Sequence, residues 1–269
     1  MKPQTLRGSD GSLRWIETGH GKALRGEPLV LIHGVGMRAE AWGPQMGLAG
    51  RVIAVDMPGH GGTSALPDGA LLTDYVDWAA RAMALLGLAS ANVAGHSMGA
   101  LIALGLAVRH PARVRRVALL NGVHRRDAAA RSAVVARAKA ISGGDFDLET
   151  PLNRWFQPEQ AAVRADVAGW LSGVDRAGYA AAYRAFSLGD TTFADDLDRV
   201  SCPALFLTGA DDPNSTADMA RSMAAATPLG HFVVIDHHRH MVNLTAPDLV
   251  NAALTAWLAT PLAQLEKRA

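Results

Sequence analysis

A serine set between two glycines is the position in this sequence whose surroundings most clearly suggest chemistry. Residues 95–99 read GHSMG, with Ser97 at the centre, after a short apolar stretch and before an apolar, helix-like one. A G-x-S-x-G pattern between a strand and a helix is typical of a nucleophilic serine, because side chains beside it would collide on so tight a turn. The turn exposes the hydroxyl at a helix start, where the helix dipole favours a developing anion. We therefore interpret Ser97 as a candidate nucleophile.

A serine hydroxyl is a poor nucleophile until a base removes its proton. The interpretation therefore requires a histidine, and an acid that orients it, elsewhere in the chain. Two adjacent aspartates, Asp211 and Asp212, follow an apolar run, and three histidines lie close together further on, at His237, His238 and His240. These residues are the nearby candidates for the acid and the base.

The elements that would position these residues follow an alternating order. Residues 28–32 and 51–55 are continuous apolar runs, which are typical of parallel strands buried on both faces. Similar patterns predict further strands at 12–18, 91–95, 114–120, 203–209 and 231–236, and helices at 73–86, 98–107 and 247–258. Strand and helix in alternation predict a doubly wound α/β sheet.

The alternation breaks between residues 125 and 198, where helix-like stretches rich in Ala, Arg and aromatic residues contain no convincing strand. We interpret residues 125–198 as a helical insertion that enters late in the sheet. The whole chain, residues 1–269, is then a single α/β domain that carries this insertion.

Composition excludes several other classes of protein. The chain has 269 residues, of which 49% are hydrophobic, and its 26 Lys and Arg against 25 Asp and Glu give a net charge of +1. No basic excess indicates a nucleic acid or an anionic membrane as a partner. A single cysteine, Cys202, excludes an intrachain disulfide framework. Without a signal-like leader or a membrane-length apolar run, the sequence predicts a soluble, cytoplasmic protein.

Several segments together resemble the α/β-hydrolase family. They are the GHSMG turn, the sequence HGVG at 33–36, the sequence DMPGHGGTS at 56–64, and GADD at 209–212. The family order of nucleophile, acid and histidine implies that Asp212 is the acid and His240 the base, and His240 has the expected proline seven residues later, at Pro247. Arg239 stands where the family commonly has glycine.

The resemblance also implies an oxyanion hole and a capped pocket. The backbone N–H groups of Val35 and Met98 are expected to hold the oxygen of the attacked carbonyl. No cofactor or metal is implied, and the histidines near His240 match no familiar metal-ligand spacing.

The predicted insertion resembles the cap of the 3-oxoadipate enol-lactonase group at residues 154–156 (RWF) and 178–181 (GYAA). On that resemblance, Trp155 is a candidate substrate contact, and His124, just past a strand end, is another. The reaction expected is hydrolysis of a small carboxylic ester or lactone through an acyl-enzyme. The expected partner is a small-molecule substrate, and the oligomeric state is left open.

Three alternatives share the same scaffold. A carbon–carbon bond hydrolase acting on a ring-cleavage dienoic acid would use the same three residues on a ketone. A cofactor-free perhydrolase would require hydrogen peroxide and a short-chain acid. A non-catalytic protein would bind a ligand in the capped pocket, because fold alone does not determine function.

Overall fold

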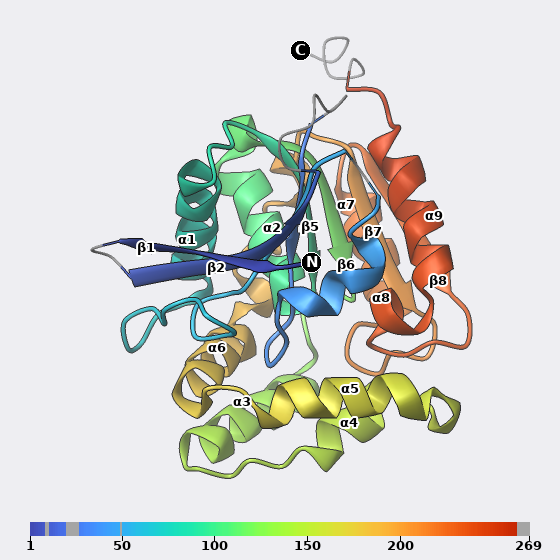
Figure 1. Cartoon of the computed structure of the whole chain (residues 1–269). Helices are drawn as coiled ribbons and strands as arrows, with labels where there is room; N and C mark the ends of the chain where they lie inside the picture. Colours follow the sequence, from blue (N-terminus) through green and yellow to red (C-terminus); the bar gives the residue numbers. More distant parts are fainter. Residues whose placement is uncertain (9–10, 20–26, 49, 263–269) are drawn as a thin grey trace.

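The computed structural model of the protein describes residues 1–8, 11–19, 27–48 and 50–262. Its strands form one eight-stranded sheet in the order β1-β2-β4-β3-β5-β6-β7-β8 (Figure 1). They are β1 (Pro3–Gly8), β2 (Gly11–Thr18), β3 (Leu29–Ile32), β4 (Val52–Val55), β5 (Ala91–His96), β6 (Val114–Leu120), β7 (Ala204–Gly209) and β8 (Gly230–Ile235). The pairings of β2 with β1 and β4 are antiparallel, and the others are parallel. The predicted doubly wound, mostly parallel sheet is confirmed.

Strand β1 is the one strand that the sequence did not predict. All but one of its six residues are exposed, so it has no buried face to leave an alternating apolar pattern. It pairs with β2 at the edge of the sheet, where backbone hydrogen bonding rather than burial holds it.

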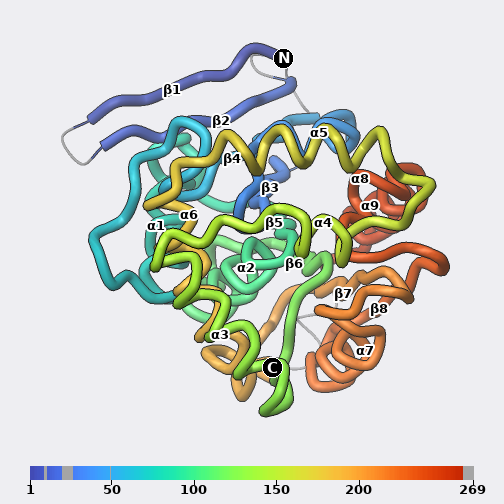
Figure 2. Tube along the Cα trace, turned by 90° about the horizontal axis from the view of Figure 1, so that it is seen from below, coloured from blue at the N-terminus to red at the C-terminus, as the bar shows by residue number. Residues whose placement is uncertain are grey.

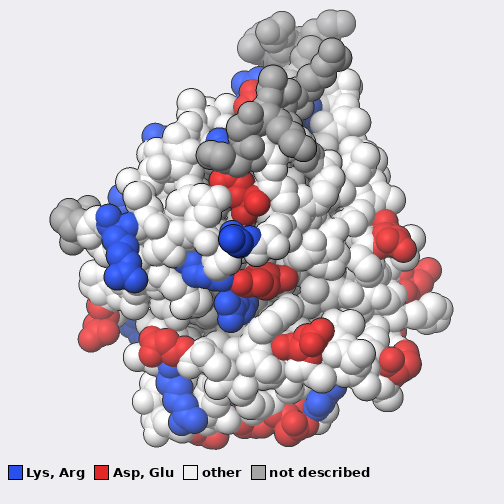
Figure 3. Space-filling view, viewed as in Figure 1, with Lys and Arg blue, Asp and Glu red and all other residues white. Residues whose placement is uncertain are grey.

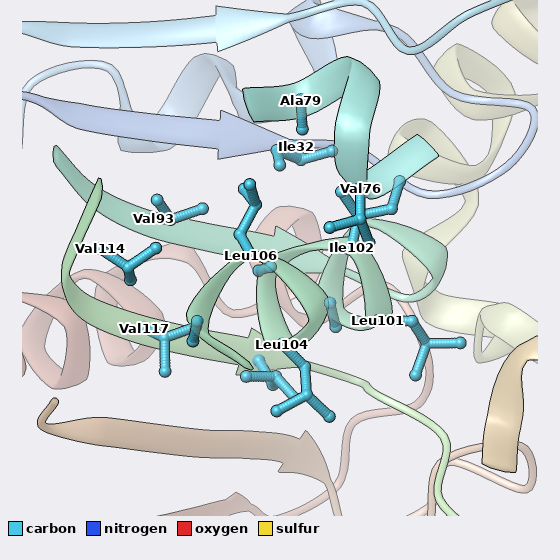
Figure 4. Close-up of a cluster of buried hydrophobic side chains, with 14 of the residues drawn as sticks. Ile32, Val76, Ala79, Val93, Leu101, Ile102, Leu104, Leu106, Val114 and Val117 are labelled. Carbon is cyan, nitrogen blue, oxygen red and sulfur yellow. The ribbon is translucent and has the colours of Figure 1, made fainter. Parts of the chain in front are cut away.

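Helices cover both faces of the sheet. On one face lie α1 (Leu72–Leu85), α2 (Met98–Arg109) and α7 (Ala217–Ala226), and on the other the 3₁₀ segment η1 (Ala39–Gln45), α8 (Val242–Thr245) and α9 (Pro247–Leu258). Figure 4 shows the first layer, where Ile102 and Leu106 of α2 pack between Ile32, Val76 and Val93. Helix α2 is buried along nearly its whole length, which fixes the position of the turn before it.

A layer of helices lies between β6 and β7 in the sequence and covers one end of the sheet (Figures 1 and 2). It consists of α3 (Ala128–Ser142), α4 (Glu149–Trp155), α5 (Ala161–Ser172) and α6 (Arg176–Leu188), with short 3₁₀ turns η3 (Pro158–Gln160), η4 (Gly189–Thr191) and η5 (Leu197–Arg199). We call α3 to α6 the cap. Its buried side chains, such as Leu171 and Tyr179, form an apolar cluster with Met37 and Met241 of the sheet domain.

Charged side chains of both signs are interspersed over the face seen in Figure 3. A buried ion pair joins Arg14 of β2 to Asp56 in the loop after β4. Within the described residues, no helix is long and apolar enough to cross a membrane.

Candidate active site

The turn between β5 and α2 holds Ser97 in a conformation that non-glycine residues rarely adopt. Its backbone has φ 55° and ψ −115°, with the side chain at the N-terminus of α2. A side chain at Gly95 would collide with the backbone of Gly99, and one at Gly99 would collide with the backbone of Ile32. The two glycines are therefore required by close backbone approach, as the sequence pattern suggested.

His240 and Asp212 meet where the loops after β7 and β8 converge. The Nδ1 atom of His240 lies 2.7 Å from Oδ2 of Asp212, and both side chains are almost completely buried. Asp211, the neighbouring candidate, is exposed and accepts a hydrogen bond from Gln157 instead. The structure thus pairs His240 with the aspartate that the resemblance implied.

Two further groups orient the Asp212 carboxylate. Asn121, which has φ 50° at the end of β6, donates from Nδ2 to Oδ2 of Asp212 at 2.8 Å, and the N–H of Asn214 donates to Oδ1 at 2.8 Å. Burial would raise the pKa of Asp212, but the charge of His240 and these hydrogen bonds hold that pKa below its usual value. The carboxylate therefore stays ionised beside the imidazole.

The histidine inside the GHSMG turn supports the loop that carries His240. The Nε2–H of His96 donates to the backbone oxygen of His240 at 2.8 Å, and the two rings lie 5.0 Å apart. Burial, followed by the nearby His240, lowers the pKa of His96 to about 3. His96 is therefore neutral and acts as a fixed donor.

The loop after β3 lies directly against Ser97. A Cβ added to Gly34 would stand 3.1 Å from Cβ of Ser97, so this backbone is at contact distance from the candidate nucleophile. His60 fixes the loop by accepting a hydrogen bond from the N–H of Gly36 at 2.9 Å. Among the hydrogen bonds of the described residues, none uses the N–H of Val35 or Met98. Both groups are available as oxyanion donors.

A cavity of about 250 Å³ lies between Ser97 and the cap. Ser97, His240 and Val35 line it from the sheet side, and Trp155 lines it from α4. The Trp155 indole is stacked on the His240 imidazole, with centroids 5.9 Å apart and planes inclined by 28°. His124 is buried but does not line this cavity, so the structure does not bring it to the site as the sequence analysis expected.

The charged residues that line the cavity come from the cap and the loop that leads into it. Three are arginines, Arg126, Arg137 and Arg154, and one is an aspartate, Asp127, whose carboxylate caps α3 by accepting the N–H of Ala130. The lining therefore has an excess of arginine over aspartate, within which Arg126 is paired with the buried Asp190 and Arg137 with Asp147. The sequence analysis quoted Arg154 only as part of a resemblance and missed the other two arginines. Their signal, the Ala/Arg bias of the insertion, is compositional and does not say which arginines face inward.

Comparison with known proteins identifies the chain as a hydrolytic enzyme. The sequence profile of the alpha/beta hydrolase family matches residues 29–253, and the chain belongs to that family. The resemblance on which the sequence analysis relied is thereby confirmed.

The chain is also similar to individual hydrolases of known sequence or structure. The chain is 53% identical over 240 residues to (E)-2-((N-methylformamido)methylene)succinate hydrolase of Acinetobacter baylyi, covering 87% of this chain and 91% of that protein. Over a shorter stretch of 103 residues, 36% of each chain, it is 40% identical to 2-hydroxymuconate semialdehyde hydrolase of a Pseudomonas species. The crystal structure of the enol-lactonase from Burkholderia xenovorans superposes with a TM-score of 0.84 at 25% identity, covering 96% of this chain and 100% of that one.

Within the described residues, no group of three or more His, Cys, Asp or Glu side chains is placed to hold a metal ion.

Proposed function

We propose that the protein is a serine hydrolase that removes a small acyl group through an acyl-enzyme formed on Ser97. The hydroxyl of Ser97 attacks the carbonyl carbon while His240 Nε2 takes its proton, and Asp212 stabilises the imidazolium that forms. The N–H groups of Val35 and Met98 hold the oxyanion. His240 then gives the proton to the leaving group and activates a water molecule, which releases the acid and restores Ser97.

The substrate that we propose is a small unsaturated dicarboxylate carrying an acyl group on nitrogen, of the type named for the Acinetobacter baylyi relative. In such a compound a formyl carbonyl is bonded to nitrogen, and that nitrogen is attached to a carbon–carbon double bond next to a carboxylate. Water would split the carbonyl–nitrogen bond to give formate and an enamine. The double bond delocalises charge from the departing nitrogen towards the carboxylate, which makes an otherwise poor amine leaving group easier to expel.

The excess of arginine over aspartate in the lining of the cavity is the observation that carries this proposal. The side chain of Arg154 has no ion pair or hydrogen bond among the described residues. Arg137 donates to the backbone oxygen of Asp147 at 2.7 Å, lies 3.5 Å from the Asp147 carboxylate and also interacts with Tyr179 and Tyr183. Guanidinium groups bind carboxylates through paired, charge-assisted hydrogen bonds. Two arginines above one serine suit a substrate that carries two carboxylates and one scissile carbonyl.

An assay of formate release tests the proposed substrate class. Purified protein is given (E)-2-((N-methylformamido)methylene)succinate and, in parallel, its dimethyl ester, which keeps the scissile bond but has no carboxylate charge. We expect formate from the diacid, with kcat/KM for the diester lower by about 100-fold or more, since two charge-assisted contacts are lost. Equal rates for the two compounds would contradict the proposed role of the arginines. No formate from either would contradict the proposed substrate.

An enol-lactone is the second candidate, because the enol-lactonase superposes on 96% of this chain. An enol-lactone shares the essential feature of the first substrate, a carbonyl whose leaving atom is attached to a carbon–carbon double bond. The hypothesis that the protein hydrolyses a carbon–carbon bond is supported over a smaller part of the chain, since the similarity to 2-hydroxymuconate semialdehyde hydrolase covers 36% of it. Assaying a lactone and a dienoate beside the formamide ranks the three by kcat/KM.

We also propose that the reaction takes place in the cytoplasm on a free small molecule, as the composition of the chain predicts. Fractionation of cells that express the protein tests this location, and recovery in the membrane or periplasmic fraction would contradict it.

A further inference from the structure

The residue just before His240 connects the catalytic loop to the cap. Nη1 of Arg239 donates to the backbone oxygens of Asn153 and Phe156, each at 2.8 Å. These two carbonyls lie at the C-terminal end of α4, where a helix leaves its last oxygens without internal partners and where a cation is favoured by the helix dipole. A single guanidinium therefore fastens the end of a cap helix to the loop of the candidate base.

A second link from the same stretch reaches both catalytic loops. Nε2 of Gln157 donates to Oδ2 of Asp211 at 3.0 Å and to the backbone oxygen of His237 at 3.1 Å. Asp211 precedes Asp212, and His237 lies in the loop before His240. Residues 153–157 are thus tied to the segments that carry the acid and the base. We call Arg239 and Gln157 the latch.

In the sequence, Trp155 lies between Asn153 and Phe156, whose backbone oxygens accept hydrogen bonds from Arg239. Its indole is the cap group stacked on the His240 ring, at 5.9 Å and 28°. An aromatic face attracts a cation above it, so this stack favours the imidazolium that His240 becomes when it takes the proton of Ser97. The same stack restricts rotation of the imidazole. Contact between Trp155 and His240 depends on where the end of α4 lies, and the latch sets that place.

We propose that Arg239 is a positioning residue, which acts through Trp155 to hold His240 in its catalytic orientation and to make formation of the imidazolium depend on a seated cap. This inference rests on the proposed serine mechanism.

The test is a kinetic cycle on Arg239 and Trp155 with p-nitrophenyl acetate, a neutral ester that does not depend on the cavity arginines. Arg239→Ala and Trp155→Ala are each expected to slow the acylation burst by about 10- to 100-fold, as misplacement of a catalytic group does. The double variant is expected to be no slower than the slower of the two single variants, because each change removes the same contact between Trp155 and His240. Arg239→Lys, which retains a donor and a charge, is expected to recover part of the rate.

Two controls separate the latch from general damage. Arg184→Ala removes another cap arginine, an exposed one on α6 that donates to the backbone oxygen of Gly69, and is expected to leave the burst unchanged. Gln157→Ala breaks only the second link, and it supplies the same test with a smaller expected loss if Arg239→Ala does not fold. Losses that multiply in the double variant, or a burst in Arg239→Ala equal to that of the unmodified protein, would overturn the latch. Absence of any burst in the unmodified protein would instead contradict the serine mechanism.

Discussion

The sheet side and the cap side of the cavity are built in different ways. On the sheet side, Ser97, Asp212 and His240 are buried at the ends of parallel strands. A short hydrogen bond joins His240 to Asp212, and the glycines on either side of Ser97 lie where any side chain would collide with the backbone. On the cap side, the Arg154 side chain has no hydrogen bond or ion pair among the described residues, and Arg137 is held by Asp147 and by two tyrosines of α6. The rigid side suits a reaction common to many relatives, and the less constrained side suits recognition of one substrate.

This contrast predicts that changes to Ser97, Asp212 or His240 abolish turnover of every substrate, whereas changes to the arginines of the cap discriminate between substrates. The variants that follow test that division, from the largest expected effect to the smallest.

Replacing the nucleophile is expected to have the largest effect. Ser97→Ala should lower kcat by about 10⁴-fold or more on charged and neutral substrates alike, because no covalent intermediate can form. Its urea unfolding midpoint should stay close to that of the unmodified protein, since only a hydroxyl is removed. Steady-state kinetics on the formamide and on p-nitrophenyl acetate measure the loss, and a variant that keeps its turnover would refute the mechanism.

Removing the charge of the acid is expected to cost nearly as much. Asp212→Asn should lower kcat by about 10⁴-fold, because the amide does not hold the imidazole in the tautomer that accepts the serine proton. Asp211→Asn is the matched control on the neighbouring, exposed aspartate, and it should change kcat only a few-fold. Equal losses in the two variants would show that the acid has been assigned wrongly.

The cap arginines are expected to affect binding of charged substrates only. Arg137→Ala and Arg154→Ala should each raise KM for the succinate substrate by about 10- to 100-fold, the cost of one charge-assisted contact, while p-nitrophenyl acetate is cleaved as before. Arg184→Ala again serves as the control. If both arginine variants lose activity on the neutral ester to the same extent, the two sides of the cavity are not divided as we describe.

The buried histidine of the sheet side predicts how stability changes with pH. The pKa of His96 is lowered to about 3 from 6.5, so between these values the unfolded chain binds a proton that the folded one does not. The stability that depends on a neutral His96 is fully present above pH 6.5 and is lost as the pH falls towards 3. The free energy of unfolding therefore decreases by about 2 kcal/mol between pH 7 and pH 5. Urea titrations at several pH values should show that the free energy of unfolding falls less steeply with decreasing pH in His96→Asn than in the unmodified protein. His231→Asn, a change at an exposed position, should leave this slope unchanged.

The sequence predicted the sheet side well because its constraints are local. The glycines around Ser97 are recognisable from the sequence of the turn alone. The resemblance to the α/β-hydrolase family then implied His240, which has a proline seven residues later. The buried strands are recognisable for a similar reason, since burial on both faces leaves continuous apolar runs. Strand β1 escaped because it is exposed and held by pairing alone.

The cap side could not be predicted in the same detail. Which arginines face the cavity depends on how α3 and α4 pack, and an Ala/Arg-rich helix offers several equivalent choices. The expectation for Trp155 placed it at the cavity, but its stacking on His240 emerges only from tertiary contacts. His124 illustrates the limit, because a position after a strand end did not suffice to bring it to the cavity. Arg239 was noticed as a departure from the family pattern, without any indication of what it contacts.

The central claim is that a covalent acyl group forms on Ser97, and mass spectrometry of quenched enzyme tests it most directly. The protein is mixed with p-nitrophenyl acetate, stopped with acid within the burst, digested and analysed peptide by peptide. The account predicts one acetyl group on the peptide that contains Ser97, and none in Ser97→Ala. Turnover with no adduct on that peptide, or an adduct on another residue that persists in Ser97→Ala, would contradict it.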